Sequence, residues 1–125
     1  MGVVGVGIDL VDVGRMARAL ARGGDRFAAR VFTAREARWA AGKPDGARRF
    51  ALCFAAKEAL WKAMGTGWPR GGKFTDAELL HKSGAPFLEV SGAARDILDG
   101  RGVSRVEVTT SGERNLAICL VLLLR

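Results

Sequence analysis

The sequence has 125 residues, about half of them hydrophobic and a quarter charged, which suits one domain with one core and excludes an intrinsically disordered chain. The formal net charge of +7 is carried by residues 14–49, where ten Arg or Lys stand against three acidic residues. Such a basic region favours an acidic partner, and charge alone leaves open whether this is nucleic acid, anionic lipid or an acidic protein.

The N-terminal segment has no basic region followed by an apolar signal core, so we expect a cytoplasmic protein. Residues 3–10 alternate larger and smaller side chains and predict a strand. The larger residues are expected to form its buried face: Val4, Val6, Ile8 and Leu10. Asp9 then falls on the opposite face.

A helical period begins after Asp12, which is the candidate N-cap, and the predicted helix ends at Gly23-Gly24. Thr33 and Glu36 have capping-box spacing and predict a second helix that runs to about Ala41. The segment 48–64 lacks Gly and Pro and predicts the longest helix, ended by Gly65-Thr-Gly67.

The C-terminal half predicts short strands over residues 74–81, 86–90, 105–110 and 115–124, with a helix over 92–98. Residues 84–86 and 111–113 are predicted turns, the second within a hairpin. The sum is an α+β domain with an antiparallel sheet packed against the long helix.

Cys53 and Cys119 lie in apolar runs without the companions that a zinc site needs, so both are predicted to be buried thiols. The apolar run 116–124 is too short to cross a bilayer core of about 30 Å as a helix and is predicted to be a buried strand. We therefore expect no membrane association.

Several charged residues are candidates for chemistry. Asp9 stands in an apolar strand, where its carboxylate meets a metal, a partner or solvent. Glu58 and Lys62 share one side of a helix, which also suits an ordinary ion pair.

Arg15, Arg18 and Arg22 line another helix face, which suits an acidic helix, a phosphate backbone or simple solvation. His81 has no Ser or Cys pattern around it and is interpreted as structural.

Three segments together resemble the holo-(acyl carrier protein) synthase family. They are Gly5-Val-Gly-Ile-Asp9-Leu-Val-Asp12, the Arg26-Phe27 pair with Arg30-Val-Phe-Thr33-Ala-Arg-Glu36, and Phe54-Ala-Ala-Lys57-Glu58-Ala-Leu-Trp-Lys62-Ala-Met-Gly65-Thr-Gly67. The resemblance spans nearly the whole chain, in order, and includes Gly84-Ala-Pro86 and the final hairpin.

The resemblance implies one phosphopantetheinyl transferase domain over residues 1–125, with the fold of that family. It implies an enzyme that takes coenzyme A, attaches 4′-phosphopantetheine to a serine of an acidic apo acyl carrier protein, and releases adenosine 3′,5′-bisphosphate. Fatty acid, polyketide and peptide carriers all stay open. The resemblance also implies a homotrimer whose active sites lie at the subunit interfaces.

Position by position, Asp9 and Glu58 match the family's ligands of Mg²⁺, and Lys62 matches a lysine that contacts coenzyme A phosphate. These three are the expected catalytic residues, with Glu58 or a metal-bound water as the base for the carrier serine. Gly65 and Pro86 match positions that shape the cofactor cleft, and Ser111 matches a cofactor contact. The carrier-docking residues on the first helix are expected to be Arg15, Arg18, Arg22 and Arg26.

Two positions depart from the family pattern. Cys53 stands where an Arg is common, and Gly112 stands where a His commonly follows Ser or Thr. These departures leave a second hypothesis open, a divergent relative that binds a carrier or a coenzyme A-type ligand without efficient transfer. A nucleic-acid-binding module rests on charge alone and lacks a recognisable motif, so we expect no nucleic-acid partner.

Overall fold

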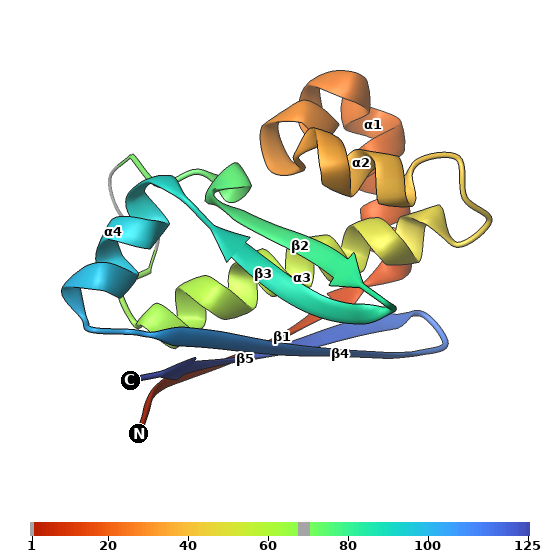
Figure 1. The fold of residues 1–125 in the computed structure, drawn as a ribbon. Helices are drawn as coiled ribbons and strands as arrows, with labels where there is room; N and C mark the ends of the chain where they lie inside the picture. Colours follow the sequence, from red (N-terminus) through yellow and green to blue (C-terminus); the bar gives the residue numbers. More distant parts are fainter. Residues whose placement is uncertain (1, 68–70) are drawn as a thin grey trace.

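The structure, a computed structural model, describes residues 2–67 and 71–125 (Figure 1). The elements in chain order are β1 (Val3–Asp12), α1 (Val13–Val31), α2 (Ala34–Ala40), α3 (Gly46–Met64), the 3₁₀ turn Phe74–Asp76, β2 (Ala77–Lys82), β3 (Ala85–Val90), α4 (Gly92–Gly100), β4 (Arg105–Glu113) and β5 (Leu116–Leu124). The predicted α+β class is confirmed.

Two antiparallel sheets pack around helix α3. One has the strand order β1-β5-β4, and the other is the β2-β3 pair (Figure 1). Helix α3 lies between them and contacts β1, β5 and β2. In β5, alternate residues point at this helix and are fully buried: Ala117, Cys119, Val121 and Leu123. The predicted sheet against a long helix is therefore present, as two sheets rather than one.

The orientation of β1 is opposite to the prediction. Val6, Ile8 and Leu10 are 56–58% exposed, whereas Gly5 and Gly7 face α3. A Cβ atom on Gly7 would lie 2.0 Å from the carbonyl oxygen of Ala59, so only glycine allows the strand to approach the helix this closely. The expectation that the larger residues form the buried face was wrong, except that Val4 is partly buried against the core.

The helix signals in the sequence are largely confirmed. The Asp12 side chain caps α1, and the Thr33–Glu36 capping box starts α2. Helix α3 ends at Gly65, which adopts a left-handed conformation with φ 71°. Helix α1 does not end at Gly23-Gly24, because a kink at Gly24 (φ 57°, ψ −150°) is followed by further helix up to Val31.

The two hairpin turns each lie next to the predicted position. Ser83 and Gly84 have positive φ and join β2 to β3, so Pro86 belongs to β3. Residues 111–113 continue β4, and the turn to β5 is formed by Arg114 and Asn115, with φ 54° at Arg114. The predicted turn at 111–113 was wrong, although the hairpin itself is present.

Both cysteines are free and fully buried, as predicted. Burial raises the pKa of the Cys119 thiol to about 12, and that of Cys53 rises further still. None of the helices in residues 2–67 and 71–125 is long and apolar enough to cross a membrane.

Candidate functional site

Asp9, Glu58 and Lys62 come together although nearly fifty residues separate the first from the second. The close β1–α3 contact turns Asp9 toward the helix, and Glu58 lies on the facing side of α3. The Lys62 ammonium donates to Asp9 Oδ1 at 2.9 Å and to the carbonyl oxygen of Ile8 at 3.0 Å. The structure thus brings the three expected catalytic residues to one place.

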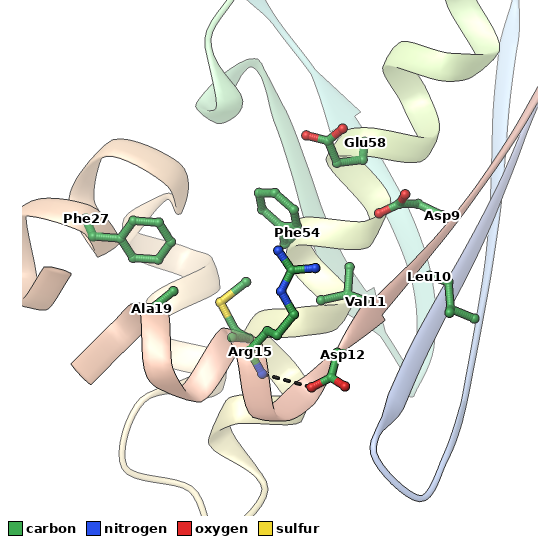
Figure 2. Close-up of a pocket in the computed structure, with 10 residues that line it drawn as sticks. Asp9, Leu10, Val11, Asp12, Arg15, Ala19, Phe27, Phe54 and Glu58 are labelled. Carbon is green, nitrogen blue, oxygen red and sulfur yellow. Dashed lines mark hydrogen bonds between the residues drawn. The ribbon is translucent and has the colours of Figure 1, made fainter. Parts of the chain in front are cut away.

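Asp9 and Glu58 line an open cleft of about 440 Å³. Figure 2 shows Asp9, Glu58 and Arg15 converging on it from three different elements, β1, α3 and α1. Its remaining lining is mostly apolar and comes from β1, α1 and α3: Leu10, Val11, Met16, Ala19, Phe27 and Phe54. The cleft therefore joins a charged end, with carboxylates and the Arg15 guanidinium, to an apolar side, an arrangement that suits a ligand with both polar and apolar parts.

The Glu58 carboxyl titrates above its ordinary range. Burial is the main cause of this raised pKa, followed by the negative charge of Asp9, while Lys62 acts in the opposite direction. Two carboxylates that repel each other in a partly buried cleft are a place where a cation is favourable. A carboxylate with a raised pKa also accepts a proton more readily, as a general base must.

Asp12 fixes the position of Arg15. Its Oδ1 accepts from the Arg15 backbone N–H at 2.9 Å and from the Asn115 side-chain amide at 3.0 Å. Strand β1 thereby passes directly into helix α1 beside the β4–β5 turn. The helix begins at the cleft, and Arg15 in its first turn is held beside the carboxylates.

The predicted docking stripe lies on the surface of α1. Arg15, Arg18, Arg22 and Arg26 are all exposed. Arg26 follows the Gly24 kink, and Phe27 beside it lines the cleft. The exposed arginines thus begin at the cleft with Arg15 and continue on both sides of the kink.

The other predicted cofactor residues lie at different places. Gly65 is three residues beyond Lys62, at the end of α3. Pro86 is paired with His81 in the β2–β3 sheet. Ser111 is an exposed residue of β4 paired with Ile118, on the sheet face that points away from α3. Within one chain, neither Pro86 nor Ser111 lines the cleft of Asp9 and Glu58.

The two departures from the family pattern have structural explanations. Cys53 is fully buried, and its thiol senses the charges of Glu36 and Lys57, so this position faces the core and not the cleft. At Gly112 a Cβ atom would lie 2.5 Å from Arg48 Nη1. Arg48 crosses the hairpin there and donates to the carbonyl oxygens of Leu116, at 3.1 Å, and Arg114.

Phe27 and Phe54 line the cleft, but sequence reasoning did not select them as site residues. Phe54 precedes Glu58 by four residues on the same helix, and that spacing was a usable signal. Phe27 had no such signal, because its place depends on the Gly24 kink.

Three carboxylates line the cleft, and one of them, Asp12, caps α1, which leaves Asp9 and Glu58 as the candidate metal ligands. Among residues 2–67 and 71–125, no group of three or more His, Cys, Asp or Glu side chains lies together as a metal site. A closed zinc site with four protein ligands is therefore absent from that part of the chain. Two carboxylates fit Mg²⁺, which prefers oxygen ligands and keeps positions for water and phosphate.

Comparisons with known proteins agree along the length of the chain. The family model of the 4′-phosphopantetheinyl transferase superfamily matches residues 5–120. A holo-[acyl-carrier-protein] synthase from Koribacter versatilis is 38% identical over 122 residues, which are 97% of this chain and 98% of the relative.

Solved structures give the same result. The holo-[acyl-carrier-protein] synthase from Neisseria meningitidis has a TM-score of 0.89 and 30% identity, and the match covers 99% of this chain and 100% of that chain. The corresponding protein from Bacillus anthracis, solved in complex with CoA (3′,5′-ADP), has a TM-score of 0.78 and 31% identity, with 97% and 96% covered.

Proposed function

The chain belongs to the 4′-phosphopantetheinyl transferase superfamily and is an enzyme of that class, and we propose that it transfers 4′-phosphopantetheine from coenzyme A to a serine of an apo acyl carrier protein. The observation that carries this proposal is the meeting of Asp9 and Glu58 at one cleft, with Lys62 paired to Asp9, in a chain similar over nearly its full length to holo-[acyl-carrier-protein] synthases. The complex of the Bacillus anthracis relative supports coenzyme A as the donor.

The proposed reaction replaces the pyrophosphate bond of coenzyme A with a phosphate ester bond to the carrier serine. The carrier serine oxygen forms a bond to the phosphorus that bears pantetheine, and the pyrophosphate bond to the adenosine side breaks. Adenosine 3′,5′-bisphosphate leaves with the bond electrons, and the serine proton passes to a base. Glu58 is our candidate, because in the metal-free protein its raised pKa makes it a better proton acceptor than an ordinary carboxylate.

We assign Mg²⁺ to Asp9 and Glu58, whose pairing of like charges in the cleft supports a cation there. When bound, the ion would offset the negative charge of the pyrophosphate. Lys62 would contact a phosphate of the donor, and Gly65 leaves the end of α3 open beside it. Arg15 adds a permanent positive charge at the same cleft.

An acidic carrier would dock along the exposed arginines of α1. The stripe starts at the cleft with Arg15 and continues through Arg18, Arg22 and Arg26, so a helix lying on it would hold its serine near Glu58. Complementary charge of this kind steers association and sets orientation more than it adds affinity.

A homotrimer with shared active sites is part of the same proposal. The outer face of the β1-β5-β4 sheet is apolar and exposed at Val6, Ile8 and Leu10, a patch that monomeric proteins seldom leave uncovered. Ser111 lies on that face, so a second copy packed there could bring it to the neighbouring cleft. Pro86 likewise needs another copy to take part.

The test is transfer itself. The protein is incubated with coenzyme A, Mg²⁺ and apo carriers of the fatty acid, polyketide and peptide types, and the carriers are weighed by mass spectrometry. At least one carrier is expected to gain phosphopantetheine, and Asp9→Ala and Glu58→Ala are expected to abolish the gain. If no carrier is modified while a known transferase modifies all of them, the proposal fails. Calorimetric binding of coenzyme A without turnover would then support the divergent binding protein.

A further inference from the structure

The Lys62 ammonium is bound to Asp9 Oδ1, an oxygen that the proposed metal needs as a ligand. Its contact with Asp9 Oδ1 is 2.9 Å, an ion-pair distance, and its second contact is the Ile8 carbonyl oxygen at 3.0 Å. The Asp9 side chain is only 16% exposed, whereas the Lys62 side chain is 55% exposed. A largely enclosed carboxylate is thus neutralised by a lysine that reaches it from the solvent side.

We propose that Lys62 is a counter-ion that exchanges with the metal at Asp9, an inference that rests on the proposed function. Two cations repel each other strongly at one carboxylate oxygen, so metal binding at Asp9 displaces the ammonium. The released ammonium is then free for a phosphate of coenzyme A. In the absence of both ligands, Lys62 keeps Asp9 from standing unpaired in a partly buried cleft.

The geometry allows this exchange without movement of the backbone. Lys62 lies one turn after Glu58 on α3, and its four-carbon stem is exposed enough to change rotamer. Asp9 lies in β1, where Gly7 and Val11 are its neighbours on the same face, and its backbone is held by the pairing with β5. It is therefore the fixed partner. The mobile member of the pair is therefore the lysine.

The exchange links two binding events. A phosphate that draws Lys62 away frees Asp9 for the metal, and a metal at Asp9 frees Lys62 for phosphate. Such a coupling is reciprocal, because each ligand must raise the affinity of the other by the same factor. Without Lys62, the metal should bind the free enzyme more tightly and respond less to the donor.

Calorimetric titration of Mn²⁺ into the full-length protein without coenzyme A tests the first consequence. Lys62→Gln is expected to tighten Mn²⁺ binding about fivefold, the factor for a partly exposed ion pair. Arg15→Gln is the matched control, since it removes a cation of the cleft that does not contact Asp9. It measures how much Mn²⁺ affinity changes when the positive charge near the site is lowered in general. An unchanged or weaker affinity in Lys62→Gln, or an equal gain in Arg15→Gln, would overturn the inference.

Repeating the titrations with adenosine 3′,5′-bisphosphate tests the coupling. The nucleotide should tighten Mn²⁺ binding in the wild type by a larger factor than in Lys62→Gln, and equal factors would count against the exchange. Asp9→Ala and Glu58→Ala separate this inference from the proposed function. If both bind Mn²⁺ like the wild type, the metal assignment and the exchange both fail, whereas weakened binding in these variants with no gain in Lys62→Gln overturns the exchange alone.

Discussion

Glu36 and Lys57 form an ion pair of 2.7 Å in which both side chains are completely buried. The remaining polar groups of the pair are also satisfied. Glu36 accepts from the backbone N–H groups of Thr33 and Leu79, each at 3.0 Å, and Lys57 donates to the carbonyl oxygen of Ala77 at 2.5 Å. One pair of charges thereby ties α2, α3 and β2 together.

Lys57→Met is expected to lower the free energy of unfolding by about 3–5 kcal/mol, because it leaves the Glu36 charge buried without its partner. Urea unfolding measures the effect, and Lys82→Met at an exposed position is the control. Adding Glu36→Gln should recover part of the loss, since it removes the unpaired charge but keeps an acceptor for the backbone. A loss below about 1 kcal/mol for Lys57→Met would contradict the role of the pair.

Gly7→Ala is expected to damage stability and activity together. The added methyl group would lie 2.0 Å from the Ala59 oxygen and 2.7 Å from the Ala63 nitrogen, so β1 must move away from α3. Overpacking of this kind costs about 1–3 kcal/mol or more, and the movement also separates Asp9 from Glu58. Gly100→Ala, where a Cβ atom meets nothing within 4 Å, is the control. Thermal unfolding measures the loss of stability, and the carrier assay measures the loss of activity. Transfer by Gly7→Ala at the rate of the wild type would contradict this prediction.

Glu58 should make the metal-free protein less stable at high pH. Its pKa is raised on folding, by burial and then by Asp9. Above the raised pKa the folded protein must therefore hold an unfavourable ionised carboxylate, which lowers the free energy of unfolding. This loss of stability disappears as the pH falls and the carboxyl is protonated in both the folded and the unfolded state. Glu58→Gln removes the charge and should be more stable than the wild type at about pH 8, by about 1 kcal/mol at most because the group is only partly buried.

Near pH 4, where free carboxyls titrate, the two proteins should converge. Urea unfolding in a chelator at both pH values measures the difference. Glu113→Gln, at an exposed carboxyl, controls for the loss of a negative charge from a basic protein. Greater stability of the wild type at pH 8 would show that the sign is wrong.

The two thiols should be inert in the folded protein. Both are fully buried, and burial raises the pKa of Cys119 to about 12 and that of Cys53 further, so thiolate is scarce at pH 8. Iodoacetamide is expected to modify neither in native buffer and both in denaturant, as judged by mass. Ala34→Cys supplies an exposed thiol on α2 that should react at once. Fast native labelling of Cys53 or Cys119 would contradict the burial.

Ile8→Glu should break the proposed assembly and with it the activity. The side chain is 56% exposed on the outer sheet face, so a single chain tolerates the charge, but an apolar interface does not. Sedimentation should shift from trimer to monomer, and transfer should fall by at least about tenfold. Ala34→Glu, outside the sheet, should change neither measurement. A wild-type protein that sediments as a monomer would exclude the trimer directly.

Local signals in the sequence predicted most of the fold. The Thr33 capping box, the Asp12 cap and the Gly65 end each depend on neighbours within a few residues, and all three are confirmed. The orientation of β1 was wrong because alternation defines two faces without saying which one meets the helix. Close approach of two backbones selected the glycine face, and that is a property of packing.

The site was less accessible to local reasoning. Asp9 and Glu58 each suited an ordinary role when taken alone, and only the resemblance joined them. Both line the same cleft in the structure. The position of Arg15 beside them depends on the passage from β1 into α1, and Phe27 reaches the cleft only through the Gly24 kink. Both follow from backbone geometry that residue spacing does not encode.

Lys57 and Glu58 are neighbours in sequence, yet one is locked in the core and the other faces the cleft. Successive residues of an α-helix differ by about 100° around its axis, so the buried pair of Lys57 with Glu36 also sets the angle at which α3 presents its next residue. Insertion of one residue between Lys57 and Glu58 would turn this angle by the same amount and force a choice between burying Lys57 and aiming Glu58. The buried pair of Glu36 and Lys57 therefore fixes the rotation of α3 about its axis, and with it the direction of the Glu58 carboxylate in the cleft.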